Sequence, residues 1–253
     1  MLLDLRGRRE RVLLRRKALA EFIGTALLVT AVVGSGIAAS RLSPGDVGLQ
    51  LFENAAATAA ALIAIILAVG PVSGAHLNPV VTLANIQHKV LSVREGSAYI
   101  GAQLAGGAVG AVVANLMFGL AAFEVSTKAR GGSGLLLAET VATLGLLLVI
   151  FGVVRSGRES VAPFAVGAYI GGAYFFTAST SFANPAVTVA RMFSNTFAGI
   201  RPASVPAFVA MQLVGAGIAM LAVRVLYPES ADEEATPFGA SSLHGTERSH
   251  DGR

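Results

Sequence analysis

The sequence predicts an all-α membrane protein with six transmembrane helices and two re-entrant half-helices arranged as an inverted repeat. Its composition, 54% hydrophobic and 13% charged with a mean hydropathy of +0.67, is not that of a soluble domain. Six apolar segments are each near the length that a tilted helix needs to cross a bilayer. An Asn-Pro turn in each half of the chain precedes a run that is too short to span. We therefore expect one membrane bundle.

The first apolar segment follows a basic stretch with seven Arg and Lys residues between Arg6 and Lys17. It is longer than the roughly 7 to 15 apolar residues of a signal peptide and contains Glu21, so we expect an uncleaved first span. The six spans are expected at about residues 18–39, 51–70, 96–119, 133–154, 160–178 and 203–226.

The distribution of charge predicts the orientation of the bundle. Most of the 19 Lys and Arg residues fall on the side of the amino terminus, so the positive-inside rule predicts that both termini are cytoplasmic. The membrane is expected to be the plasma membrane. Residues 1–17 are then a basic cytoplasmic segment, and residues 227–253, which are poor in apolar side chains, are expected to be a disordered cytoplasmic tail. A nucleic-acid role is disfavoured because the basic stretch adjoins a membrane span.

An internal repeat underlies the hydrophobic pattern. Glu21 and Glu139 occupy similar places near the start of each half, and Gln103 and Gln212 occupy similar places near the end. Because each half contains three spans, the second copy enters the membrane from the opposite face, which gives an inverted repeat of about residues 18–119 and 133–226. The two half-helices then meet by their amino ends.

The Asn-Pro turns have the chemistry of helix starts. Asn is a preferred N-cap and Pro is well tolerated in the first helical turn, so short helices are expected over Val81–His88 and Val187–Phe193. Non-helical backbone at membrane depth persists only when it is buried in protein or lines a water-filled cavity, so the paired turns indicate a transport path. The two turns are Asn78-Pro79-Val80 and Asn184-Pro185-Ala186.

These paired turns, the lead-in from Ser73 to Leu77 and the repeated Glu and Gln positions resemble the major intrinsic protein family, the aquaporins and aquaglyceroporins, over residues 18–226. The resemblance implies a homotetramer in the lipid bilayer whose subunits each pass water or small neutral solutes without a cofactor. The facing helix amino ends would oppose cations, and the amides of Asn78 and Asn184 would donate to passing oxygens. The carbonyls expected to line the path are those of Gly74, Ala75, His76, Thr180, Ser181 and Phe182.

The chain departs from the family pattern at two positions. Val80 stands where the first turn usually ends in Ala, which we expect to be tolerated. Val187 stands where the family commonly places the arginine of its outer constriction, and Arg191, four residues later, could partly replace it. Without an arginine at the usual place, the pore should be wider and less selective. Matching by spacing from the turns gives a filter of Thr58, Gly172, Ser181 and Val187.

Two further sets of polar residues have a structural and a functional interpretation. Glu21 and Glu139 are expected to brace the loops that lead into the half-helices, and the alternative is solvation at the membrane interface. His76 is expected to fix its loop, and the alternative is a pH gate. The remaining His residues form no ligand spacing and Cys is absent, so no metal site is expected.

The sequence favours a passive channel for water and glycerol-like polyols. Arsenous acid and methylated arsenicals are further candidate solutes. One alternative is a water-selective channel in which Arg191 is the displaced filter. Another is an ion-coupled secondary transporter, which would need intramembrane carboxylates close to the turns. An enzyme is not expected, because no nucleophile, acid and base occur together in a recognisable pattern.

Overall fold

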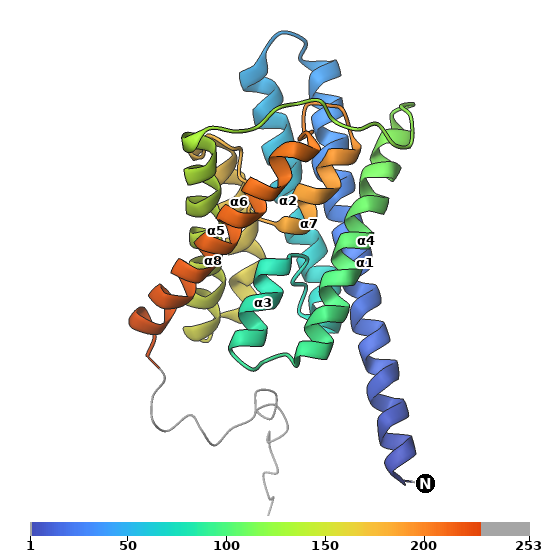
Figure 1. The fold of residues 1–253 in the computed structure, drawn as a ribbon, viewed down its shortest axis with the longest axis vertical. Helices are drawn as coiled ribbons and strands as arrows, with labels where there is room; N and C mark the ends of the chain where they lie inside the picture. The colour runs from blue at the N-terminus through green and yellow to red at the C-terminus, as the bar shows by residue number, and fades with distance from the viewer. Residues whose placement is uncertain (1, 229–253) are drawn as a thin grey trace, which may run out of the picture.

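The computed structural model describes residues 2–228, with side chains described from residue 12 onward, and over this range it is all-helical. The predicted tail, residues 227–253, lies outside the described residues except for Tyr227 and Pro228. The predicted fold class is confirmed, with six long helices and two short ones (Figure 1). The helices are α1 (Leu2–Leu42), α2 (Val47–Ser73), α3 (Pro79–Gln87), α4 (Val93–Met117), α5 (Ser133–Arg155), α6 (Ala162–Phe176), α7 (Pro185–Ala190) and α8 (Val205–Leu226).

Five of the helices, α1, α2, α4, α5 and α8, are long and apolar enough to cross a membrane. The sixth predicted span, 160–178, is present as the shorter α6, which has 15 residues and a length of about 22 Å at 1.5 Å per residue. A 3-10 turn, Glu159–Val161, precedes α6, and the chain becomes extended at Thr177, where the helix ends. α6 packs between α2 and α5.

The first helix begins earlier than the sequence predicted. α1 starts at Leu2 rather than near residue 18, so the basic segment continues the membrane helix and projects beyond the bundle (Figure 1). Leu and Arg are good helix formers and no proline interrupts the segment, so nothing in it ends the helix.

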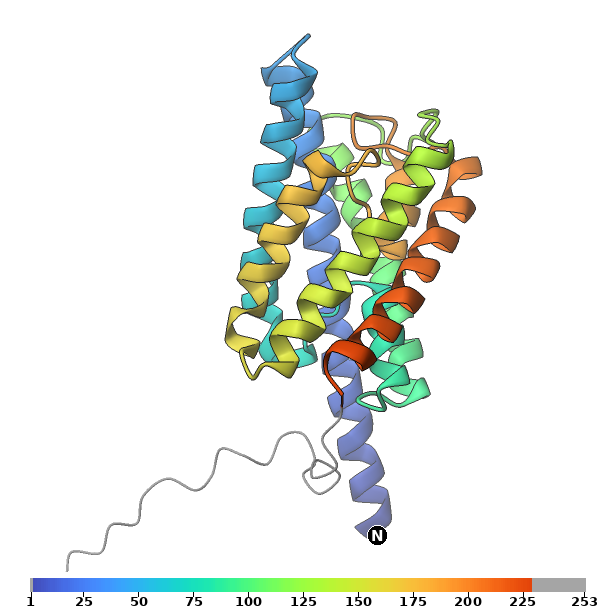
Figure 2. The ribbon, with the colours of Figure 1, turned by 90° about the vertical axis from the view of Figure 1, so that its left-hand side faces the viewer.

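The two halves of the chain have matching arrangements. α1 packs on α4 as α5 packs on α8, and the two halves are joined by the packing of α2 on α6. In Figure 1, α3 lies in the lower half of the bundle and α7 in the upper half, while the amino end of α1 and the carboxyl end of α8 both lie at the bottom. Figure 2, turned by 90°, shows α2, α6 and α5 side by side along one flank. The half-helices therefore approach each other from opposite ends.

Glycines set the closest helix contacts. A Cβ at Gly106 or Gly110 of α4 would collide with backbone carbonyls of α1, and a Cβ at Gly215 of α8 would collide with the carbonyl of Thr140 in α5. These glycines occupy equivalent faces of the two halves. A Cβ at Gly167 of α6 would collide with the side chain of Ile63 in α2. Small residues thus permit close backbone approach, as helix packing in membranes requires.

Candidate functional site

The two Asn-Pro turns cap the half-helices. The Oδ1 of Asn78 accepts a hydrogen bond from the backbone N–H of Val80 at 3.1 Å. The Oδ1 of Asn184 accepts from the N–H groups of Ala186 at 2.9 Å and Val187 at 3.2 Å. A proline is the first residue of each half-helix, where its missing N–H costs nothing. α3 covers most of the predicted run, while α7 is shorter and continues as a 3-10 turn, Arg191–Phe193.

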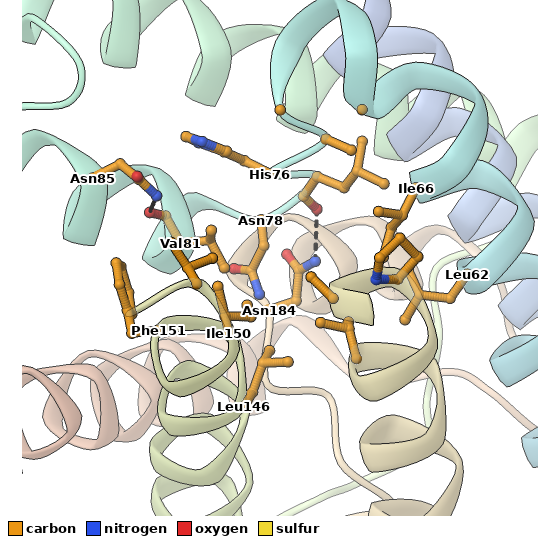
Figure 3. Close-up of a pocket in the computed structure, with 18 of the residues that line it drawn as sticks. Leu62, Ile66, His76, Asn78, Val81, Asn85, Leu146, Ile150, Phe151 and Asn184 are labelled. Atoms are coloured by element: carbon orange, nitrogen blue, oxygen red, sulfur yellow. Dashed lines mark hydrogen bonds between the residues drawn. The ribbon is translucent and has the colours of Figure 1, made fainter. Parts of the chain in front are cut away.

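The same two asparagines join the half-helices at the centre of the protein. The Nδ2 of Asn78 donates to the carbonyl of Ala183, and the Nδ2 of Asn184 donates to the carbonyl of Leu77, each at 2.8 Å. An amide nitrogen has two N–H donors, so each side chain keeps one for another partner. Figure 3 shows Asn78 and Asn184 next to each other in the pocket. Because both Oδ1 atoms serve the caps, the pair presents donors to the space beside it.

Buried carboxylates hold the two loops that lead to these caps. Glu21 accepts hydrogen bonds from the backbone N–H groups of His76 at 2.9 Å and Leu77 at 2.7 Å. Glu139 accepts from the N–H groups of Phe182 and Ala183, each at 3.0 Å. Both glutamates are 0% exposed, so their surroundings are the loops and not an interface with solvent.

Glutamine and threonine side chains complete each brace. Gln103 donates to Glu21 at 2.8 Å and to Thr82 of α3 at 3.0 Å. In the second half, Gln212 donates to Glu139 and, at 2.8 Å, to Thr188 of α7. Each half therefore contains a chain of hydrogen bonds from the glutamate to its half-helix. The His76 ring also bonds Thr82, with 3.1 Å between Nδ1 and Oγ1, and lies edge-on to the ring of Tyr99.

The braced loops contain unfavourable backbone conformations. Non-glycine residues with positive φ cost of order 1–3 kcal/mol each and persist only where surrounding structure fixes them. Since the braced N–H groups lie among or beside these residues, the carboxylates supply that fixation. The positive-φ residues of the two loops are Ala75 (47°), Leu77 (51°), Thr180 (65°), Ser181 (49°) and Ala183 (47°).

A cavity of about 1780 Å³ runs beside the asparagine pair. One wall is apolar, with Leu62, Ile66, Leu146 and Ile150 around the two asparagines in Figure 3. The opposite wall is formed by the loops. The predicted site residues that line the cavity are Thr58, Gly74, Ala75, His76, Asn78, Ser181, Phe182, Asn184, Val187 and Arg191.

Other predicted site residues lie behind this surface. Val80 is 0% exposed, so its additional methyl groups pack within the protein and do not narrow the cavity. Pro79, Pro185 and Ala186 are likewise buried and shape the caps. The residues of the prediction that do not line the cavity are Glu21, Pro79, Val80, Glu139, Gly172, Thr180, Pro185 and Ala186.

The prediction that Gly172 belongs to the filter is wrong. α6 lines the cavity through Pro163, Val166, Ile170 and Tyr174, which lie on one helical stripe. Gly172 is two residues from both Ile170 and Tyr174, about 200° around the helix, and it is exposed on the outer face. Spacing counted back from Asn184 runs through a loop, and the length of that loop does not preserve the phase of the helix before it.

Arg191 lies at the cavity, and only 2% of it is exposed. Its Nε donates to the carbonyl of Ala198, and its guanidinium stacks on the ring of Phe182, with 3.5 Å from Cζ to the ring centroid. Arg191 is therefore not a solvated charge at the end of the half-helix. Within residues 12–228, no carboxylate forms an ion pair with it. The Phe182 face and the carbonyl therefore stabilise a buried positive charge.

Arg130, in the loop before α5, reaches the same ring. Its Cζ lies 4.9 Å from the centroid of Phe182, and its Nε donates to the carbonyl of Gly199 at 2.9 Å. Burial lowers the pKa of Arg130 to about 10, which leaves it charged at neutral pH. Sequence reasoning missed Arg130 because its contacts are with residues far along the chain. Tyr174 was also missed, although its spacing of four from Ile170 indicates the cavity-facing stripe.

Comparisons with known proteins agree with this architecture. A sequence model of the major intrinsic protein family matches residues 9–181. Aquaglyceroporin AqpS of Rhizobium meliloti is 48% identical over 213 residues, which cover 84% of this chain and 91% of the relative. Probable aquaporin TIP2-2 of Oryza sativa subsp. japonica is 30% identical over 223 residues, with 82% and 86% covered. The X-ray structure of the aquaglyceroporin from Plasmodium falciparum has the same fold, with a TM-score of 0.66 at 22% identity over 83% of this chain and 95% of that one.

Proposed function

The chain belongs to the major intrinsic protein family, and we propose that it is a passive channel for water and small neutral solutes such as glycerol. The observation that supports this most is the pair of asparagine amides beside the cavity, each with one N–H already bonded across the half-helix junction and one left for a passing oxygen. The 48% identical relative, an aquaglyceroporin, supports the same class of solute.

The proposed path has a polar and an apolar side. A hydroxyl oxygen of the solute accepts hydrogen bonds from Asn78 and Asn184. The O–H groups of the solute donate to backbone carbonyls of the loop segments Gly74–His76 and Ser181–Phe182. The carbon skeleton faces Leu146 and Ile150. Both half-helix amino ends point to the middle of the path, and each carries about half a positive charge, so cations are opposed there.

The outer filter that we propose combines an open position with a displaced cation. Val187 leaves space where the family commonly has an arginine, and Arg191 supplies a guanidinium one turn further along. This arrangement favours neutral hydroxylated molecules larger than water, a class that includes undissociated arsenous acid and methylated arsenicals. Ser181 and Thr58 line the same end and offer hydroxyl groups.

An ion-coupled transporter is disfavoured because neither Glu21 nor Glu139 lines the cavity, and both serve the loop braces. A strictly water-selective channel built on Arg191 is disfavoured by the space at Val187.

We further propose that the chain has no enzymatic activity, that residues 18–226 form the channel, that four copies assemble, and that both termini face the cytoplasm from the plasma membrane. The basic side chains of Lys89 and Arg155 at the terminal end of the cavity support that orientation.

Stopped-flow light scattering on reconstituted vesicles tests the proposal. Vesicles with the unaltered chain should pass water, glycerol and arsenous acid without dependence on a proton or sodium gradient. Val187→Arg should lower glycerol and arsenous acid permeability about tenfold or more, since a guanidinium replaces the open space, and should affect water less. Vesicles that pass only water, with no change in Val187→Arg, would contradict the wide-filter proposal.

A further inference from the structure

A second, smaller pocket lies at the end of the cavity beside the chain termini. Its volume is about 520 Å³, and its lining residues come from the end of α3 with the loop after it and from the carboxyl ends of α5 and α8. α8 packs on α5 and also contacts α3, so these three elements enclose one space.

This basic pocket contains the side chains of Lys89, Arg155 and Arg224, and none of its described lining residues is an Asp or a Glu. Arg155 and Arg224 lie in the last turns of α5 and α8, where the helix dipole favours a cation. Lys89 and Arg224 are exposed, and within residues 12–228 their side chains form no hydrogen bond or ion pair. The pocket therefore suits an anionic occupant.

The basic pocket is continuous with the large cavity, because five residues line both. An occupant of the pocket consequently stands at the terminal mouth, the end of the cavity nearest the termini. Among the described residues that line the large cavity, Glu159 is the only carboxylate, and it does not line the basic pocket. The shared residues are His88, Lys89, Arg155, Tyr227 and Pro228.

The described part of the chain ends in this pocket. Tyr227 follows α8 with its N–H bonded to the carbonyl of Val223 at 2.9 Å. Its side chain packs on α5, since a Cβ at Gly152 would lie 2.9 Å from the tyrosine hydroxyl oxygen. Pro228 then lines the pocket. The next segment therefore starts from a fixed point beside the three cations.

That next segment, residues 229–234, lies outside the described residues and is acidic. An extended chain spans at most about 3.5 Å per residue, so all of it is within about 20 Å of Pro228. A short tether gives an effective concentration in the millimolar range, at which weak contacts are populated. Its four carboxylates are those of Glu229, Asp232, Glu233 and Glu234.

We propose that this acidic segment docks in the basic pocket, where its carboxylates pair with Lys89, Arg155 and Arg224, and that it narrows the terminal mouth. An exposed ion pair changes an equilibrium constant by a factor of about 1.4 to 5, so three pairs give about threefold or more. Docking is therefore reversible and sensitive to salt. The narrowing rests on the proposed channel function, whereas the docking does not.

Docking can be measured without transport, because the chain contains no Cys. Gln87→Cys in the pocket and Ala231→Cys in the acidic segment create one thiol pair in the full chain, and peptide mass mapping detects its intrachain disulfide after mild oxidation. A four-amide background should slow this cross-linking about threefold or more. That background carries Glu229→Gln, Asp232→Asn, Glu233→Gln and Glu234→Gln.

The control background, Glu247→Gln with Asp251→Asn, removes charges further along the same tail. It should leave the cross-linking rate at that of the unaltered tail. Equal rates in the four-amide and control backgrounds would overturn the docking.

Glycerol permeability in vesicles reports the effect on the mouth. At low ionic strength the four-amide variant should pass glycerol about threefold faster than the unaltered chain. Raising KCl on both sides from about 0.01 M to about 1 M shortens the Debye length from about 30 Å to about 3 Å. This change should bring the unaltered chain to the level of the four-amide variant, which should itself stay constant. Equal permeability of the two chains at low salt contradicts the narrowing.

A double variant of the pocket, Lys89→Glu with Arg224→Glu, tests the other partner. It should raise glycerol permeability at low salt as the four-amide variant does, because the pocket then repels the segment. Size-exclusion chromatography establishes that it is folded. Unchanged permeability of the folded double variant would count against this pocket as the docking site.

The lipid composition identifies the occupant. In vesicles of phosphatidylcholine alone, no anionic headgroup competes with the acidic segment, and both sets of variants should show their full effect. If the double variant has an effect only when phosphatidylglycerol is present, and the four-amide variant has none, the pocket binds a lipid phosphate and the tail is not its occupant. If no chain passes water or glycerol at high salt, the channel proposal fails, while the cross-linking rates still decide the docking.

Discussion

Glu139→Gln should destabilise the protein and lower its permeability together. The Glu139 carboxylate accepts hydrogen bonds from the N–H groups of Phe182 and Ala183 and from Gln212. A glutamine of the same shape has one acceptor oxygen, and its NH₂ group must face one of these donors. One backbone N–H therefore loses its partner, and the remaining bonds become neutral ones.

The magnitude follows from these contacts. A buried donor without a partner costs about 1–3 kcal/mol, and a hydrogen bond to a charged acceptor exceeds a neutral one by about 1 kcal/mol. The expected loss of unfolding free energy is about 2–4 kcal/mol. For a chain of this size, 1 kcal/mol corresponds to about 2–4 °C in melting temperature, so we expect a decrease of about 5–15 °C. Relaxation of the positive-φ backbone at Ser181 and Ala183 should also displace the wall of the cavity and slow water passage.

Circular dichroism melting in detergent and stopped-flow water permeability measure the two effects. Glu21→Gln is the internal comparison, because Glu21 occupies the equivalent place in the first half and accepts from His76, Leu77 and Gln103. Glu124→Gln, in an exposed loop, controls for loss of a charge. The bracing argument is refuted if Glu139→Gln melts and conducts like Glu124→Gln.

Two other substitutions test the packing and the cap. Gly106→Val should prevent accumulation of folded protein, because its Cβ collides with the Phe22 carbonyl, whereas Gly101→Val on the exposed side of the same helix should be tolerated. Size-exclusion chromatography after extraction compares them, and equal yields would contradict the packing argument. Asn184→Asp should lower water permeability severalfold, because a carboxylate oxygen then faces the Leu77 carbonyl that the amide now bonds. Unchanged permeability in stopped flow would show that this donor is not needed.

The fold was predictable because its signals are local and occur twice. Six apolar runs fix the number of long helices, and the Asn-Pro turns fix the starts of α3 and α7. The order of Glu, Asn-Pro and Gln in both halves predicted the braces, and Glu21 and Glu139 do bond the loops. The start of α1 was not predictable from hydropathy, since a basic helix can continue an apolar one without a break.

The filter was less predictable because it depends on the rotation of helices that loops separate. Thr58, Ser181 and Val187 were placed at the cavity by counting along the chain. The same counting failed at Gly172, because the loop between α6 and Asn184, residues 177–183, is longer than the loop between α2 and Asn78, residues 74–77. A helical stripe ending at Tyr174 was the better guide there. Arg130 reaches Phe182 through contacts with Gly199 and Ser179, which no local pattern encodes.

On the proposed function, the displaced arginine Arg191 changes the size of the filter while retaining its charge. Arg191 is four residues beyond Val187, about 6 Å along a helix at 1.5 Å per residue. On the proposed function, the guanidinium still opposes cations at the outer end, in addition to the two half-helix amino ends at the centre. Between the Arg191 guanidinium and Asn184, the path is lined by the apolar Val187 and by the hydroxyl-bearing Ser181 and Thr58. A neutral molecule with both carbon and hydroxyl surfaces matches this segment better than water alone does, and a cation meets repulsion at both of its ends.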